Sequence, residues 1–362
     1  MAGARPNFMK LAPLYHALAE EEWVQLKIIH TGQHYDANMD STFFEDLRLP
    51  EPDVHMGIGS GSHAEQTGKI MMGYEQLCQK EIPHLTIVMG DVNSTLATSI
   101  ACAKMGVPVG HLEAGLRSFD RSMPEEVNRV LTDAISDILW TPSADADANL
   151  MKEGVSPEKI HRVGNIMIDS IELLRPKIEE DNFREKLGLT KGEYALVTLH
   201  RPSNVDDPKK LENLCLILKE MSREVPIVFP VHPRTGKNLK MLPLFEGLHK
   251  KESLTLIEPV GYIQFMNLLF NARMVVTDSG GLQEETTYLH IPCLTLRGNT
   301  ERPITITMGT NRLSTLGSIR DDFRSAMNGH WTKGKIPEYW DGKTAGRVVS
   351  SLEKYFGVTV HQ

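Results

Sequence analysis

The stretch Gly110–Arg129 reads GHLEAGLRSFDRSMPEEVNR and contains four carboxylates and three arginines within twenty residues. It follows a short apolar run at Val107–Val109 and precedes an apolar pattern of helical period at Val127–Ile138. In open α/β sheets, the side chains that carry chemistry gather on loops beyond the carboxyl ends of the strands. The stretch is therefore predicted to be such a loop, and we expect other segments to bring a ligand to its acids.

Composition narrows the class of protein. The length of 362 residues favours two domains, and the formal net charge of −8 disfavours nucleic acid or an acidic membrane as the partner. No apolar run approaches the ~20 residues of a membrane span. The four cysteines contain no C-x-x-C pair, which disfavours a zinc site or a redox pair and favours a reducing, cytoplasmic location.

Short apolar runs alternate with longer amphipathic stretches, which is typical of parallel α/β units. Strands are expected in the first half at Leu26–His30, Leu85–Met89, Val107–Val109 and Ile138–Trp140. Helices are expected there at Pro13–Glu22, Thr67–Gln79, Thr95–Lys104 and Glu125–Ser136. Further strands are expected at Tyr194–Leu199, Ile227–Phe229, Leu254–Ile257, Met274–Thr277 and Pro292–Leu296.

A charged, helical segment at Asp169–Gly192 separates the two halves. We therefore predict two doubly wound, Rossmann-like α/β domains that face each other across a cleft. The predicted domains are residues 1–170 and 171–343, and the last helix, within residues 344–362, is expected to pack back on the first domain.

Two turns have the composition of anion sites. In Asp278-Ser279-Gly280-Gly281, a strand runs into a flexible turn that opens a helix, whose free N–H groups suit a phosphate. Glu285, further along that helix, is placed to accept the hydroxyls of a ribose. The second turn contains Arg5 and Lys10 near Pro6, a residue suited to a first helical position. The alternative for the first turn is an ordinary strand-to-helix turn with a glycine pair, and the alternative for the second is a solvated loop with two surface charges.

Three acids are candidates for proton transfer. Asp91, Glu113 and Glu125 are expected near one rim, where neighbouring carboxylates raise one another's pKa. Acid–base work at a carbon needs one group to remove a proton and another to return it. The alternatives are a helix cap for Asp91, a first-turn acid for Glu125, and a salt bridge from Glu113 to Arg117 or Arg121. Without nearby histidines at ligand spacing, the three acids make a poor zinc site, so no metal site is predicted, and magnesium is the alternative left open.

Other polar residues receive weaker assignments. His200 follows a predicted strand and could orient or protonate a phosphate oxygen, although a bond to neighbouring backbone is equally compatible with its position. His232 is similar and weaker. His34 and His111 are expected to have structural roles, and Glu126 is expected to serve the helix terminus.

These motifs, taken in order, resemble the non-hydrolysing UDP-N-acetylglucosamine 2-epimerases, which share the two-domain GT-B architecture. The matching segments run nearly from end to end: G-A-R-P at 3–6, T-G-Q-H at 31–34, G-D at 90–91, H-L-E-A-G-L-R at 111–117, P-E-E-V-N-R at 124–129, T-L-H-R at 198–201, H-P-R-T at 232–235, T-D-S-G-G-L-Q-E-E at 277–285 and T-E-R-P at 300–303. The resemblance implies cofactor-free inversion at C2 of the sugar, by elimination of UDP to 2-acetamidoglucal and its re-addition.

The resemblance also implies roles for individual residues. Acid–base catalysis would fall to Asp91, Glu113 and Glu125, with His200 assisting the leaving phosphate. The UDP group would be held by Arg5, Lys10, Phe265, Ser279, Gly280, Gly281, Glu285 and Arg302. The resemblance implies a homodimer. It implies neither a metal nor a cofactor.

Several alternatives remain open. The family normally begins with an apolar strand before G-x-R-P, whereas this chain opens almost on the loop, so we expect further residues upstream of Met1. The rival activities are a 2-epimerase of a related UDP-2-acetamido sugar, such as a diacetamido uronic acid, and a hydrolysing 2-epimerase. A GT-B glycosyltransferase would share the nucleotide turn but not the three acids, and the acids also disfavour a non-catalytic UDP-sugar sensor.

Overall fold

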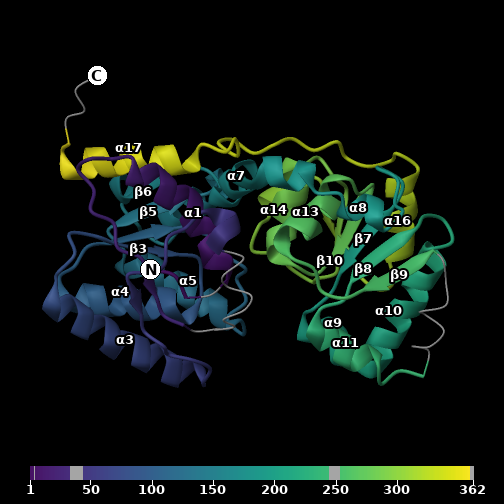
Figure 1. Cartoon of the computed structure of the whole chain (residues 1–362), viewed down its shortest axis with the longest axis horizontal. Helices are drawn as coiled ribbons and strands as arrows, with labels where there is room; N and C mark the ends of the chain where they lie inside the picture. Colours follow the sequence, from purple (N-terminus) through teal and green to yellow (C-terminus); the bar gives the residue numbers. More distant parts are fainter. Residues whose placement is uncertain (4, 33–43, 244–252, 359–362) are drawn as a thin grey trace. The chain divides into compact units, whose positions relative to one another are not determined.

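The chain folds into two compact units. The structure, a computed structural model, describes residues 1–3, 5–32, 44–243 and 253–358. Unit 1 comprises Met1–Leu174 with Glu338–Gln362, and unit 2 comprises Arg175–Pro337. Both units contain parallel sheets covered by helices, so the predicted α/β class with two Rossmann-like units is confirmed (Figure 1). Among the described residues, no helix has both the length and the apolar character needed to cross a membrane.

Unit 1 alternates strands and helices. Its elements are α1 (Arg5–Ala19), β1 (Ile29–His30), β2 (Val54–His55), α3 (His63–Lys80), β3 (Thr86–Met89), α4 (Asn93–Met105), β4 (Val109–Leu112), α5 (Pro124–Ile135), β5 (Ile138–Thr141), α6 (Ala144–Lys152), the 3-10 turn Pro157–Lys159, β6 (Ile160–Arg162), the first part of α7 (Ile166–Glu180) and α17 (Thr344–Phe356). Strands β3, β4, β5 and β6 form one parallel sheet in that order, and β1 pairs with β2 in another.

The first residues of the chain lie between these two sheets. Ala2 forms a parallel bridge with His30 of β1, and the Met1 amino group donates to the Ile87 carbonyl of β3 at 3.0 Å. A short stretch of extended chain thus lies between β1 and β3.

Strand β4 differs from its prediction. The apolar run suggested Val107–Val109, whereas the strand is Val109–Leu112 and ends directly before Glu113. Gly110 is required there because a Cβ at this position would lie 2.5 Å from the Trp140 ring of β5. A glycine and a histidine inside a buried strand do not produce an apolar pattern, so the end of β4 could not be located from hydrophobicity.

Helix α1 also differs from its prediction. It begins at Arg5 and continues through Pro13, where the helix was expected to begin. The extra turns bury Phe8 and Met9 and place Lys10 within the helix.

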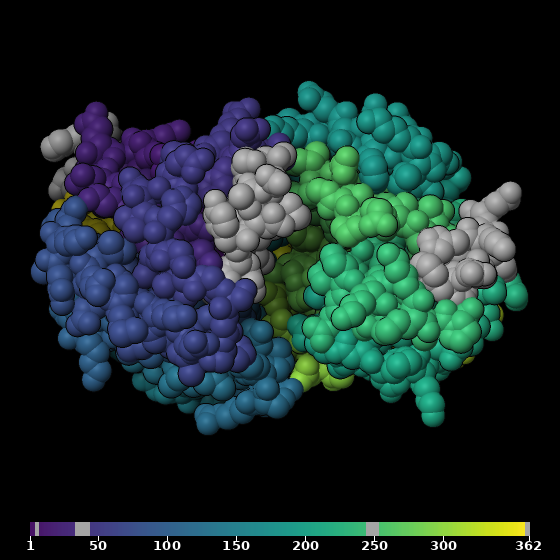
Figure 2. All heavy atoms as spheres, turned by 60° about the horizontal axis from the view of Figure 1, so that its bottom comes forward, coloured from purple at the N-terminus to yellow at the C-terminus, as the bar shows by residue number. Residues whose placement is uncertain are grey.

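The C-terminal helix packs on unit 1. The Trp140 indole donates to Ser351 Oγ of α17 at 2.9 Å, and the Ala345 N–H donates to Asp169 of α7 at 2.8 Å. Helices α1 and α17 lie on one side of the sheet, and α3 and α4 lie on the other (Figure 1). In the space-filling view, the yellow C-terminal end of the chain lies among purple and blue residues of unit 1 (Figure 2).

Unit 2 is a six-stranded parallel sheet in the order β12-β11-β10-β7-β8-β9. Its elements are the end of α7, α8 (Phe183–Lys186), β7 (Ala195–Thr198), α9 (Pro202–Val205), α10 (Pro208–Met221), β8 (Ile227–Pro230), α11 (Pro233–Leu239), β9 (Leu254–Ile257), α13 (Tyr262–Phe270), β10 (Met274–Thr277), α14 (Gly280–Tyr288), β11 (Cys293–Thr295), α15 (Ile304–Thr307), β12 (Asn311–Leu313) and α16 (Ile319–Met327). Apolar residues of α10 and α16 form a core with the strands.

The strand order of unit 2 reverses between β7 and β10, which are neighbours in the sheet. In doubly wound sheets, this switch point leaves a crevice at the carboxyl ends of the strands where ligands bind. His200 follows β7 and Asp278 follows β10, so both residues lie at the switch point.

Candidate active site

The acids of unit 1 follow two adjacent strands. Glu113 comes directly after β4 and Asp91 lies two residues beyond β3, so the parallel register brings both loops to one edge. Glu113 has a φ of 76°, in the left-handed region that costs a non-glycine residue about 1–3 kcal/mol. Strain of this kind persists where surrounding contacts enforce it, and it is concentrated at functional sites.

Glu113 is paired with Lys10 of α1, not with Arg117 or Arg121 as the alternative had it. Both side chains are largely buried, with exposed fractions of 9% for Glu113 and 11% for Lys10. Gly90 makes room for the pair, because a Cβ there would lie 2.8 Å from Lys10 Nζ. Lys10, predicted only as a phosphate ligand, therefore also neutralises an acid.

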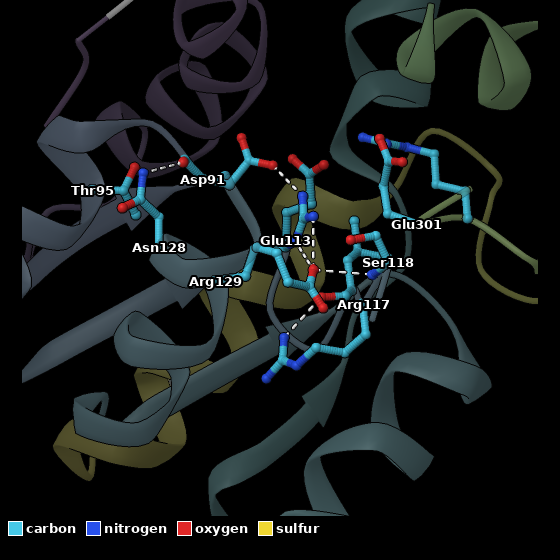
Figure 3. A network of polar contacts seen from close by, with 12 residues as sticks. Asp91, Thr95, Glu113, Arg117, Ser118, Asn128, Arg129 and Glu301 are labelled. Atoms are coloured by element: carbon cyan, nitrogen blue, oxygen red, sulfur yellow. Dashed lines mark hydrogen bonds and ion pairs between the residues drawn. The ribbon is translucent and has the colours of Figure 1, made fainter. Parts of the chain in front are cut away.

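Asp91 is paired with Arg129 of α5. The Asn128 side-chain amide also donates to the Asp91 carbonyl at 2.8 Å, so α5 holds both the side chain and the backbone of this residue (Figure 3). Asp91 is not the cap of α4, since Val92 occupies that position. Arg129 and Lys10 thus place one cation beside each of these two acids, which the sequence did not predict for Asp91.

The two consecutive glutamates of α5 have different surroundings. Glu125 is exposed in the first turn, and no hydrogen bond or ion pair of its side chain is found within the described part of the chain. Glu126 is buried and accepts from the backbone N–H groups of Ser118 and Phe119 at 2.9 and 2.8 Å. It also binds Arg129 at 2.8 Å. Glu126 therefore anchors the loop after Glu113. The prediction gave it only the role of an acid at the helix terminus, and the structure adds this contact with the loop.

These contacts keep Glu126 ionised. Burial alone would raise its pKa, but hydrogen bonds from Ser118, Arg129 and Phe119 outweigh burial and hold the pKa below its ordinary value.

A buried network lies beneath the two loops. The His111 side chain of β4 is fully buried, with Nδ1 2.6 Å from Asp133 of α5 and Nε2 2.8 Å from the Gly90 carbonyl. Asp133 also accepts from the Gly115 N–H at 3.0 Å and from Arg117 at 2.7 Å. His111 therefore has the structural role expected of it, since it links α5 to the backbone directly before Asp91.

In unit 2, His200 lies against a buried acid. Its Nδ1 is 3.0 Å from Asp278. Asp278 also accepts from the backbone N–H groups of His200 and Arg201 and from the Asn204 amide, each at 3.0 Å. Burial would raise the pKa of Asp278, but these donors and the His200 charge hold the pKa below its ordinary value. The ring of His232 lies 5.6 Å from that of His200, and burial lowers the pKa of His232.

The predicted phosphate turn opens α14. Ser279 is the cap residue, and its side chain makes no capping hydrogen bond. A Cβ on Gly281 would meet no atom within 4 Å, whereas one on Gly280 would lie 2.7 Å from Glu301 and 2.9 Å from Arg302. Gly280 thus lies close to the ends of the Glu301 and Arg302 side chains, while Gly281 borders open space. Helix N-termini of this kind bind phosphate through backbone N–H groups.

The other predicted nucleotide contacts surround α14 in different ways. Glu285 is buried, and burial together with the neighbouring charge of Glu284 raises its pKa to about 7. Arg302 binds Glu284 at 2.8 Å and also pairs with Glu301. Phe265 lies half-buried on α13.

Two other residues named in the sequence analysis lie partly or wholly outside the described part of the chain. Arg5 is the first residue of α1, but its side chain lies outside the described part of the chain. His34 lies wholly outside it.

Sequence reasoning missed Arg129 and Asp133 as parts of this site. A signal existed for Arg129, because it follows Glu125 and Glu126 at helical spacing in P-E-E-V-N-R. Asp133 follows Arg129 by one further turn of the same helix, but its contact with His111 depends on strand and helix packing that spacing does not reveal.

Known proteins resemble this chain over its whole length. The family model described as UDP-N-acetylglucosamine 2-epimerase matches residues 16–353. A UDP-N-acetylglucosamine 2-epimerase of Methanococcus maripaludis is 43% identical over 97% of this chain and 96% of its own. A UDP-2,3-diacetamido-2,3-dideoxy-D-glucuronate 2-epimerase of Pseudomonas aeruginosa is 42% identical over 97% of this chain and 98% of its own.

Solved structures agree. The UDP-GlcNAc 2-epimerase of Methanocaldococcus jannaschii, in complex with UDP-GlcNAc and UDP, has a TM-score of 0.86 and 41% identity, with 98% of each chain covered. A lipopolysaccharide outer core galactosyltransferase, at 13% identity and a TM-score of 0.56, shares the fold alone. These likenesses confirm the predicted GT-B type of fold. The chain therefore belongs to the UDP-N-acetylglucosamine 2-epimerase family.

Proposed function

We propose that this protein catalyses the reversible C2 epimerisation of UDP-N-acetylglucosamine to UDP-N-acetylmannosamine without net hydrolysis. The observation that carries the proposal is the pair of acids at the ends of β3 and β4, Asp91 and Glu113, each set against its own cation. Family membership and the substrate named in the complex of the Methanocaldococcus relative support the same substrate here.

The chemistry explains why paired acids suit this reaction. The C2 proton of the sugar is not acidic, so its removal must accompany departure of a good leaving group, UDP. Elimination across C1–C2 gives 2-acetamidoglucal, and re-addition of UDP with a proton on the opposite face completes the inversion. One acid takes the proton and another returns it. Asp91 and Glu113 are proposed for these roles together with Glu125, whose exposed side chain is free to approach a substrate.

Unit 2 is proposed to bind UDP. The α14 N-terminus, at Ser279, Gly280 and Gly281, would hold a phosphate, and Glu285 would accept the ribose hydroxyls. Arg302 and Phe265 are proposed as further nucleotide contacts.

The remaining roles concern the diphosphate and its departure. Because His200 directs Nδ1 at Asp278, Nε2 would serve the leaving phosphate. Arg5 and Lys10 are proposed as diphosphate ligands from unit 1. Every step assigned here uses side chains and backbone of this chain, without a cofactor.

A second substrate has specific support. The Pseudomonas relative named for a UDP-diacetamido uronic acid is 42% identical, almost as similar as the Methanococcus relative named for UDP-N-acetylglucosamine, at 43%. The same acids would perform that reaction, and only the sugar contacts would differ.

The test is to incubate the protein in deuterated water with each UDP-sugar separately and to follow the sugars by NMR. The proposal expects UDP-N-acetylmannosamine and deuterium at C2 of both substrate and product. Free N-acetylmannosamine would indicate a hydrolysing enzyme instead. Exchange with the UDP-diacetamido uronic acid alone would show that this sugar is the substrate instead. No exchange with either UDP-sugar would contradict the proposed epimerisation.

A further inference from the structure

Resting on the proposed function, we propose that Asp133 is a positioning residue for the epimerisation. It acts through a doubly protonated His111 ring and through the Gly115 backbone. These two contacts hold the loops that carry Asp91 and Glu113.

The hydrogen-bond partners of His111 determine its protons. Nε2 faces the Gly90 carbonyl, which can only accept, and Nδ1 faces an oxygen of Asp133. With Asp133 ionised, both ring nitrogens must donate, so the ring carries two N–H groups. The ring is fully buried, and a buried nitrogen lone pair directed at an oxygen would be costly.

The charges around the ring favour an ionised Asp133. Besides His111, Asp133 receives Arg117 and the Gly115 N–H, and Arg117 is bound on its other side by Glu153 at 2.7 Å. Burial would raise the pKa of Asp133, but the charges of His111 and Arg117 outweigh it and hold the pKa below its ordinary value.

The first link reaches Asp91. The peptide between Gly90 and Asp91 is held through its carbonyl by His111, and the Gly90 N–H donates to the Leu112 carbonyl at 3.0 Å. Gly90 has a φ of 65°, so this is a tight turn whose orientation sets where the Asp91 side chain begins. The backbone before Asp91 is thus held by His111, which Asp133 orients, and the Asp91 side chain is held by Arg129 of α5.

The second link reaches Glu113. Its N–H and that of Ala114 donate to the Trp140 carbonyl at 3.1 and 3.0 Å, and the next N–H, of Gly115, donates to Asp133. Gly115 lies tight against α6, since a Cβ there would lie 2.5 Å from the Ala146 carbonyl oxygen. Asp133 is therefore one of the contacts that enforce the left-handed backbone of Glu113.

Two substitutions at position 133 separate positioning from charge. Asp133→Ala removes the contacts of Asp133 with His111, Gly115 and Arg117, and a displacement of the acids by about 1 Å is expected to lower kcat by about 10²-fold. Asp133→Asn is isosteric. Its amide can donate to Nδ1 of a neutral His111 while its oxygen accepts from Gly115, so most of the activity should return. UDP binding, measured by calorimetry, should stay within about twofold in both variants, because the change concerns the acids.

The control is Asp169→Ala, which removes another buried carboxylate of unit 1. Asp169 accepts from the Ala345 N–H of α17, and within the described residues it makes no hydrogen bond or ion pair with either acid-bearing loop. This variant should lose stability and keep kcat.

Nitrogen-detected NMR of the histidine rings gives a readout independent of activity. In the wild type, both nitrogens of His111 should resonate as N–H nitrogens, and in Asp133→Asn only Nε2 should do so. A neutral ring in the wild type, an Asp133→Ala variant with wild-type kcat, or an Asp133→Asn variant as slow as Asp133→Ala would each overturn the proposal.

The experiment remains decisive if Asp133→Ala does not fold, because the wild-type ring spectrum and the rate of Asp133→Asn each test it. Failure of the proposed function is distinguishable, since the wild type would then show no exchange at C2 while the ring spectrum is unaffected.

Discussion

The acids of unit 1 and those beside α14 in unit 2 are held in contrasting electrostatic states. Glu113 and Asp91 lie against Lys10 and Arg129, so their charges are compensated before any ligand binds. In unit 2, Glu284 has Arg302, but Glu285 is buried beside that acid and its pKa is raised to about 7.

The difference separates two kinds of site. A group that removes a proton from carbon must be ionised and aimed in advance, which a paired cation and backbone hydrogen bonds achieve. A group that receives ligand hydroxyls can be left incomplete, and its missing hydrogen bonds then favour the ligand that supplies them. On this account, unit 1 is preorganised for chemistry, and Glu285 is completed by binding.

The largest effect is expected for Glu113→Gln, which keeps the shape of the side chain and removes its basicity. General acid–base groups contribute about 10²–10⁴-fold in rate, so deuterium exchange at C2 should fall by that factor. UDP binding, measured by calorimetry, should persist. Exchange at the wild-type rate would show that Glu113 takes no part in proton transfer. It would also contradict the idea that the acids of unit 1 are preorganised for chemistry.

Removing the cation should affect stability. Lys10→Met removes the cation that pairs with the largely buried Glu113 carboxylate, and breaking a buried pair costs about 3–5 kcal/mol in the free energy of unfolding. The double variant Lys10→Met/Glu113→Gln should regain most of that loss in chemical denaturation. Additive losses would show that the two side chains are not coupled.

Glu285→Gln should change how stability depends on pH. Because the folded-state pKa is raised from 4.5 to about 7, the folded protein binds the extra proton between those values, and wild-type stability is lost as pH rises through this window. Above it, the variant should be more stable than the wild type by up to about 3 kcal/mol, and near pH 4 the two should be equal.

The same substitution should weaken UDP binding, since an amide cannot accept both ribose hydroxyls as a carboxylate does. UDP affinity of the wild type should rise with pH through about 7, and this rise should be smaller in the variant. Parallel pH profiles of stability in the two proteins would contradict the raised pKa.

The smallest change in stability is expected for Glu125→Gln, because the side chain is exposed. The free energy of unfolding should move by less than about 0.5 kcal/mol, while C2 exchange should fall, because Glu125 is proposed as an acid or base. Glu126→Gln is the matched control one residue away. It weakens the anchor of Ser118 and Phe119 and should lower the melting temperature clearly.

The adjacent glutamates also show how far sequence can lead. Both were visible as acids at the start of a helix, but the phase of α5 decides that Glu126 points inward and Glu125 outward. The pairing of Lys10 with Glu113 joins residues 103 positions apart, and no local pattern predicts such a contact. Spacing did reveal the strand-to-helix turn at Gly280 and the acid that follows it, because both depend on local geometry.

Strand boundaries mark the same limit. The apolar run at Val107–Val109 indicated a strand, yet β4 continues through Gly110 and His111 because Trp140 and Asp133 accommodate them. The position of Glu113 at the strand end therefore rests on tertiary packing.

Cleavage of the C1–oxygen bond is the step on which the account depends most. UDP-N-acetylglucosamine carrying a heavy oxygen isotope in the bridge between C1 and the β-phosphorus tests it directly, with recovered substrate examined by phosphorus NMR. The account predicts that the label moves to non-bridging β-phosphate positions while deuterium enters C2. Deuterium at C2 with the label still wholly in the bridge would contradict elimination.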